Sequence, residues 1–163
     1  MAGQNQTTIY TEQGGGKRVY ESGAILELQS GASIDVQAGA LVGTICGATM
    51  VVGTEATNAI NVTIQLTDSQ GADLAVIGHV RAYLSDASTG IGISGTAPAT
   101  SVAIGTDGAI IVEQVTKLAW ELQSEADGDI DLTITETGAD TWYLVVVLPD
   151  GRQVVSDAIT FAA

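Results

Sequence analysis

The chain of 163 residues has few cysteines, prolines, aromatic residues and basic residues. Its single cysteine, Cys46, cannot form an intrachain disulfide, which excludes a disulfide-stabilised scaffold. No apolar run approaches the length that spans a membrane, and no basic segment followed by an apolar one marks a signal peptide. These absences favour a soluble protein that is made in a reducing compartment.

Basic residues are so few that the net charge is −14. This charge opposes binding to nucleic-acid phosphate and to anionic membranes, so neither is expected as a partner. The charge is also uneven. Residues 1–20 hold Glu12 against Lys17 and Arg18, whereas residues 21–163 hold the other eighteen acids against three basic side chains. The start of the chain is therefore physically unlike the rest.

Residues 1–19 are polar and contain three consecutive glycines, 14–16. This composition predicts an extended arm with a flexible hinge, and plain disorder is the alternative. If the arm docks on a partner, its apolar contacts are expected from Ile9 and Tyr10.

A repeat of eight residues follows the arm. The segment SGAILELQ, which begins at residue 22, is followed by SGASIDVQ and then by AGA. Alternation places the apolar residues of each unit on one side of a very short strand. Eight residues cannot cover their own core, because solenoid coils take about twenty residues or more.

The economical way to bury this repeat is a short β-helical stem shared by three chains around a threefold axis. The trimer interface is then expected from Leu26, Leu28, Ile34, Val36 and Leu41. An ordinary hairpin packed on the next domain is the alternative. Residues 48–60 are interpreted as a connector, so the predicted organisation is an arm (1–19), a stem with connector (20–60) and a main domain (61–163).

The main domain is predicted to be all-β. Abundant Gly, Ala, Val, Ile and Thr favour strands with tight turns. About seven alternating or apolar runs within some hundred residues fit an immunoglobulin-like β-sandwich. The Cys-Trp-Cys hallmark of antibody domains is absent, so only the architecture is predicted. The runs are 61–68, 75–85, 109–115, 117–123, 129–136, 141–148 and 152–161.

Two details follow from these runs. The run 141–148 is the most apolar and is expected to be a central strand. Alternation places one of Trp142 and Tyr143 inside the sandwich and the other outside.

Residues 87–100 are rich in Gly, Ser and Thr and are expected to form a long loop that is either functional or mobile.

No motif predicts catalysis, a metal centre or a cofactor. The glycine pattern of residues 90–95 matches a dinucleotide-binding motif, but Thr-Ala-Pro follows it instead of a helix start. Asp127, Asp129 and Asp131 are interpreted as a solvated acidic turn, with weak divalent-cation binding as the alternative. His79 shares a strand face with Arg81 and has no ligand or nucleophile at suitable spacing. We expect that the protein is not an enzyme.

A resemblance adds a function. The phrases VTIQLTDSQGADL, VRAYLSDASTG and DGDIDLTITETGADTWYLVVVLPDGRQVVSDAITF resemble a domain of tailed-bacteriophage virion proteins. The stem SGASIDVQAGA is similar to short β-helical stems of phage head fibres and capsid decoration (cement) proteins. The resemblance implies a structural homotrimer on the outer capsid surface of a virion, made in the host cytoplasm, with the major capsid protein as partner.

That family supplies no catalytic residues. We expect Ile9, Tyr10, Lys17 and Arg18 to bind the capsid, the two basic residues meeting acidic capsid groups. A tail-fibre or baseplate component whose sandwich binds glycan is the first alternative. A glycan-binding module or a small hydrolase on a β scaffold is the second.

Overall fold

The computed structural model describes residues 9–11, 18–20 and 44–162, and all regular elements among them are strands. The chain divides into two compact units, residues 1–35 and 36–163. The predicted stem residues Leu26, Leu28, Ile34, Val36 and Leu41 lie outside the described residues, as does Lys17.

The first unit contains a pair of short antiparallel strands, β1 (Ile9–Thr11) and β2 (Arg18–Tyr20). Tyr10 lies opposite Val19, and Thr11 lies opposite Arg18. The predicted arm is therefore not simply extended, because its backbone pairs with itself on both sides of the three glycines.

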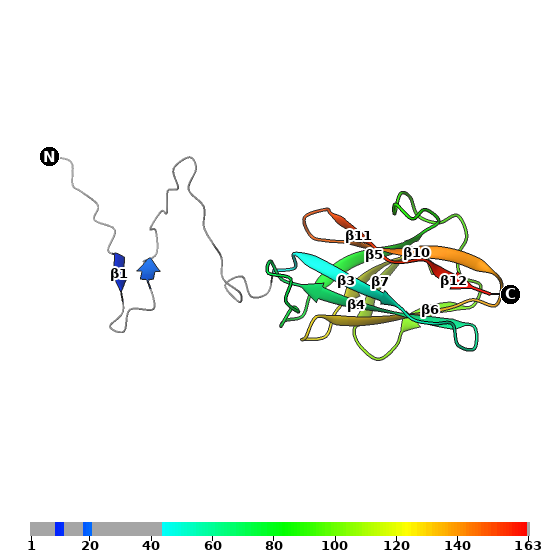
Figure 1. The fold of residues 1–163 in the computed structure, drawn as a ribbon, viewed down its shortest axis with the longest axis horizontal. Helices are drawn as coiled ribbons and strands as arrows, with labels where there is room; N and C mark the ends of the chain where they lie inside the picture. The colour runs from blue at the N-terminus through cyan, green and yellow to red at the C-terminus, as the bar shows by residue number, and fades with distance from the viewer. Residues whose placement is uncertain (1–8, 12–17, 21–43, 163) are drawn as a thin grey trace. The chain divides into compact units, whose positions relative to one another are not determined.

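The second unit is a sandwich of two antiparallel sheets, which confirms the all-β prediction (Figure 1). One sheet has the order β3 (Gly47–Val52), β4 (Ala59–Thr67), β9 (Asp129–Thr135), β6 (Ser101–Ile104). The other has the order β11 (Gln153–Val155), β10 (Asp140–Val147), β5 (His79–Ser85), β8 (Ala119–Gln123), β7 (Ala109–Val115), and β12 (Ile159–Phe161) also pairs with β10.

The core lies between the sheets and is built by strict alternation. Along β4 and β9 every second residue is fully buried, because those side chains face the other sheet. Trp142 is buried and Tyr143 is half-buried on the other face, as the alternation predicts. The Trp142 ring meets Phe161 edge to face at 6.0 Å between centroids.

Strand β10 lies inside its sheet, which confirms its predicted central position. One edge of β10 pairs with β5. The other edge pairs with β11 through residues 145–147 and with β12 through residues 140–142. Val145 lies opposite Val155 and Trp142 opposite Ile159, so β10 advances three residues while its partner advances four. Ser156 still pairs with Leu144, because its N–H donates to the Leu144 carbonyl and its hydroxyl accepts the Leu144 N–H, both at 2.9 Å. The extra residue is therefore a bulge between Ser156 and Ile159. The bulge divides the single strand predicted for 152–161.

The sandwich begins earlier than the predicted residue 61. Residues 48–52, predicted to belong to the connector, form most of β3, and every residue of β3 pairs with β4. Ile45 packs against the sandwich core. Cys46 is half-buried beside it, and its N–H donates to the Thr67 carbonyl at 2.9 Å.

Candidate functional site

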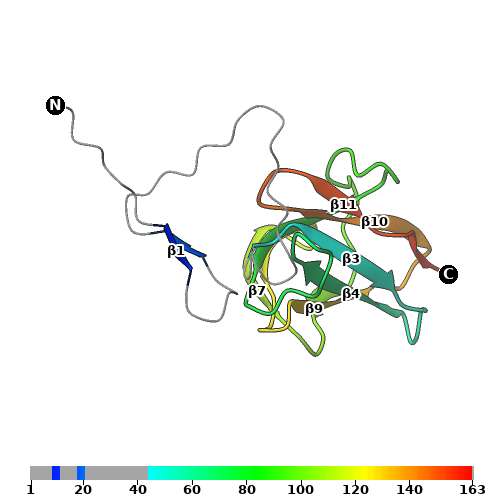
Figure 2. The same cartoon turned by 60° about the vertical axis from the view of Figure 1, so that its left-hand side comes forward.

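The long loop between β5 and β6 folds back over the outward face of the six-stranded sheet (Figure 2). The Tyr83 hydroxyl donates to the Gly90 carbonyl at 2.6 Å. Gly90 has φ +73°, and a Cβ there would lie 2.8 Å from a methyl of Val155 and 3.1 Å from one of Val145. Only glycine permits this approach. The dinucleotide-like glycine pattern therefore packs a loop onto a sheet, and β6 follows it in place of a helix.

A second anchor ties the middle of the loop to the core. The buried Trp142 donates its indole N–H to the Ser94 hydroxyl at 3.2 Å and to the Thr96 carbonyl at 3.1 Å. The Ser94 hydroxyl in turn donates to a carboxylate oxygen of Asp86 at 2.5 Å, and the Gly95 N–H donates to the other at 3.1 Å. The centre of the loop is thus bonded to a core side chain.

A third anchor holds the end of the loop between opposite charges. The buried carboxylate of Glu136 accepts the Ala99 N–H at 2.6 Å and also the N–H groups of Thr137 and Gly138. The Lys117 ammonium donates to the carbonyls of Pro98 and Ala99 at 2.8 and 2.9 Å. The hydrogen bond from Ala99, then that from Gly138, lowers the pKa of Glu136 against the opposing effect of burial, and Lys117 lowers it further.

This anchor predicts a pH dependence of stability. The pKa of Glu136 is lower in the folded chain than its ordinary value of 4.5. Its contribution is therefore complete above that pH and is lost as pH falls through the folded pKa. We expect Glu136→Gln to lower the free energy of unfolding by about 1–2 kcal/mol at pH 7. The loss should shrink when denaturant unfolding is repeated at progressively lower pH.

Asp129 supplies the control for that measurement. Burial, then the carboxylates of Asp127, Asp107, Asp131 and Asp73, raises its pKa. A raised pKa means that the charged form costs stability at neutral pH, and acid relieves this cost. Asp129→Asn should therefore raise stability at pH 7, opposite to Glu136→Gln. Equal pH profiles for the two variants would contradict both assignments.

The anchored loop presents an uncharged, apolar tip. Ile91 and Ile93 are 78% and 49% exposed although the backbone around them is bonded to the sheet. No charged residue occurs between Asp86 and Asp107. A fixed loop loses little entropy on binding, so the tip is suited to contact with another apolar surface. The sequence left open whether this loop is functional or mobile, and its anchors argue against the mobile interpretation.

The acidic turn forms no visible metal centre. Within residues 44–162, no three His, Cys, Asp or Glu side chains are arranged to hold a metal ion. Asp131 instead accepts hydrogen bonds from Asn61 at 3.2 Å and from Thr63 at 2.9 Å, as part of the polar outer face of the four-stranded sheet. The described segments also include no helix long and apolar enough to cross a membrane.

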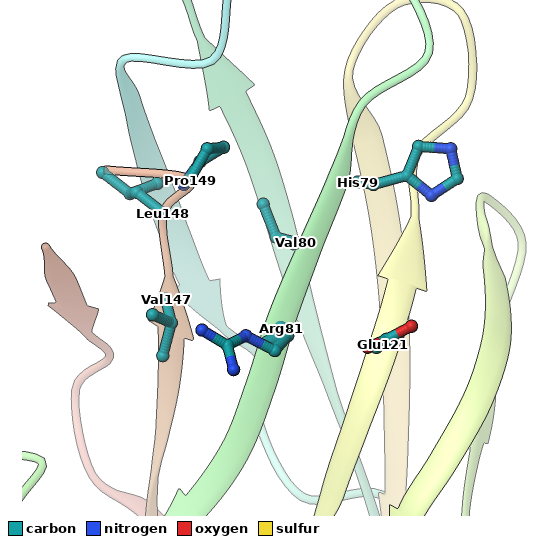
Figure 3. A pocket seen from close by; sticks show the side chains of 7 residues that line it. All are labelled: His79, Val80, Arg81, Glu121, Val147, Leu148 and Pro149. Carbon is teal, nitrogen blue, oxygen red and sulfur yellow. The ribbon is translucent and has the colours of Figure 1, made fainter. Parts of the chain in front are cut away.

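A hollow of about 310 Å³ lies on the outward face of the six-stranded sheet, at the end where β10 terminates. His79 and Arg81 of β5 are both exposed there, on the shared face that alternation predicts. The remaining lining residues are Val80, Glu121, Val147, Leu148 and Pro149. Figure 3 shows the Arg81 side chain extending from β5 toward Val147, with Glu121 on the opposite side of β5.

The structure brings only part of the predicted contact set together. Ile9 and Tyr10 lie in β1, opposite Tyr20 and Val19, and Arg18 lies in β2. The loop anchors were not predicted, because nothing local in the sequence pairs Trp142 with Ser94 or Glu136 with Ala99. The one sequence signal for a contact surface in this loop was the absence of charged residues around Ile91 and Ile93.

Comparison with known proteins identifies no relative whose known sites could be compared with these surfaces. No protein-family model, curated protein or solved structure matches the chain.

Proposed function

We propose that this protein is a structural component of a phage virion that binds the outer surface of the capsid as a homotrimer. The observation that carries the proposal is the division of the chain into two units of different character. A small unit that bears Lys17 and Arg18 precedes an acidic sandwich. This suits a protein that attaches by its beginning and displays the remainder, and the acidic part suits a place outside packaged DNA.

The repeat between residues 22 and 40 supplies the trimer in this proposal, with Leu26, Leu28, Ile34, Val36 and Leu41 in its shared interior. Three arms that bind together act at high effective concentration, so individually weak contacts combine into a firm hold. The apolar tip of Ile91 and Ile93 supplies a further uncharged contact, either to the shell or to a neighbouring trimer.

The proposal extends to the type of sandwich. Variable-type immunoglobulin domains have the strands A-B-E-D in one sheet and add C′ and C″ to the C-F-G sheet. The observed orders β3-β4-β9-β6 and β7-β8-β5-β10-β11 can be matched to these two sheets. The path differs between β5 and β9, because the chain forms β6 before β7 and β8. We propose an immunoglobulin-related sandwich with this rearranged middle.

The purified chain is expected to have three times the mass of one subunit at micromolar concentration, measured by light scattering. Leu28→Asp combined with Ile34→Asp should dissociate the trimer, because each charge would be buried three times in one interior. The sandwich of the dissociated chain should unfold as before. A folded monomer in the unmodified protein would overturn the trimer and the attachment that depends on it.

The place of the protein on a particle separates the capsid proposal from a tail-fibre or baseplate role. Gold-labelled protein should lie on heads in electron micrographs of phage particles. Label confined to tails would support the alternative.

A further inference from the structure

We propose that the hollow beside Arg81 binds the carboxylate of a carboxylated sugar, a hexuronic acid residue or its equivalent. The hollow is lined by β5, β8 and the end of β10, and its volume of about 310 Å³ lies at the lower end of small-ligand sites. This proposal does not rest on capsid binding, because it concerns the sandwich alone.

The first reason is that no acidic side chain among the described residues is paired with the positive charge of Arg81. The described sandwich holds three basic residues of the Lys and Arg type. The Lys117 ammonium is used by two loop carbonyls. Arg152 donates to Asp150 at 2.6 Å and to the Cys46 carbonyl at 2.5 Å. The Arg81 guanidinium has neither a hydrogen bond nor an ion pair with any described residue, so its donors are open to a ligand.

The second reason is that the nearest acid is held elsewhere. Glu121 is the cross-strand neighbour of Arg81. Gln114 of β7 donates to a carboxylate oxygen of Glu121 at 2.9 Å and so holds that oxygen on the β7 side. Arg81 points the other way, toward Val147 (Figure 3). The structure thus keeps apart two opposite charges that could have paired across the strands.

The chemistry of the walls selects the class of ligand. A guanidinium offers two parallel N–H donors to a carboxylate. One guanidinium balances one negative charge, and a chain of net charge −14 repels a second, so a monocarboxylate is favoured over a phosphate dianion. Val147, Leu148 and Pro149 provide an apolar wall for the carbon face of a ring, while His79 offers a polar group for hydroxyls.

The experiment is a titration of the ¹⁵N-labelled full chain with methyl β-D-glucuronide, followed by amide chemical shifts. The matched neutral probe is methyl β-D-glucoside. We expect saturable shifts at Arg81, Val147 and Leu148, with affinity for the glucuronide at least about tenfold above that for the glucoside, equivalent to about 1.4 kcal/mol. A short oligouronide tests whether the same site takes a terminal sugar of a glycan, and it should shift the same amides.

Arg81→Gln should weaken glucuronide binding at least about tenfold, to the level of the neutral sugar. Arg18→Gln removes the same charge from the other unit and should leave binding unchanged. Glu121→Gln should strengthen binding, because it removes a neighbouring negative charge. Equal binding of the two probes, or full binding by Arg81→Gln, would overturn the proposal. Stronger shifts of these amides by an acidic peptide would overturn it in favour of a protein ligand.

Discussion

Trp142→Ala is expected to lower the free energy of unfolding by about 3–5 kcal/mol, because it leaves a large cavity in a fully packed core. The indole also contacts Phe161 edge to face and donates to Ser94 and Thr96. Loss of the side chain therefore removes core packing and the central anchor of the loop together. Equilibrium denaturation by urea measures the change.

Trp142→Phe separates these two contributions, and Trp120→Phe is its control. Both tryptophans are fully buried, but the indole N–H of Trp120 has no partner within the described residues. Both substitutions remove a similar volume, and only the first breaks hydrogen bonds. We expect Trp142→Phe to cost about 1–2 kcal/mol more than Trp120→Phe. It should also speed amide hydrogen exchange in residues 86–100, whereas Trp120→Phe should not. Equal costs with an unchanged loop would show that the indole bonds do not hold it.

Deletion of residues 1–19 is expected to abolish binding to capsids while the sandwich and the trimer persist. The deletion removes β1 and all but the last residue of β2, and with them Ile9, Tyr10, Lys17 and Arg18. In the proposed trimer three arms act together, so their joint loss should weaken binding by at least about 100-fold. Co-sedimentation with shells measures the binding, and light scattering with thermal unfolding checks that the remainder is intact.

Charge reversal in the full chain is the finer version of this experiment. Lys17→Glu with Arg18→Glu keeps the length of the arm and should weaken binding by less than the deletion. The weakening should diminish at higher salt, since screening reduces repulsion between surface charges. Truncated trimers that decorate shells normally would contradict the assignment of the arm and would point to the tip of Ile91 and Ile93.

The sequence predicted those parts of the fold that repeat locally. Alternation identified β4, β9 and the inward face of β10, because each has apolar residues at every second position and one fully covered face. Strand β3 was missed because a glycine and small residues surround its apolar positions, and β6 because its four residues stand in a loop-like context. Their strand character comes from pairing with β4 and β9.

The candidate sites were less predictable, since they depend on residues that are far apart in the sequence. Alternation could place His79 and Arg81 on one face of the sheet. It could not predict that Gln114 donates a hydrogen bond to the Glu121 carboxylate. The loop could be recognised as long and glycine-rich, but not as fixed. Its attachment depends on Trp142 and Glu136, some fifty and forty residues away from their partners.

The loop over the six-stranded sheet is held mainly through its main chain. Its carbonyls at Gly90, Ile91 and Thr96 accept from Tyr83, Ser85 and Trp142, and Lys117 reaches two more. The side chains of Ile91 and Ile93 take no part in these bonds. The identity of these two positions is therefore decoupled from the path of the backbone. The surface that the tip presents can be changed by substitution, during evolution or in the laboratory, while the scaffold beneath stays as it is.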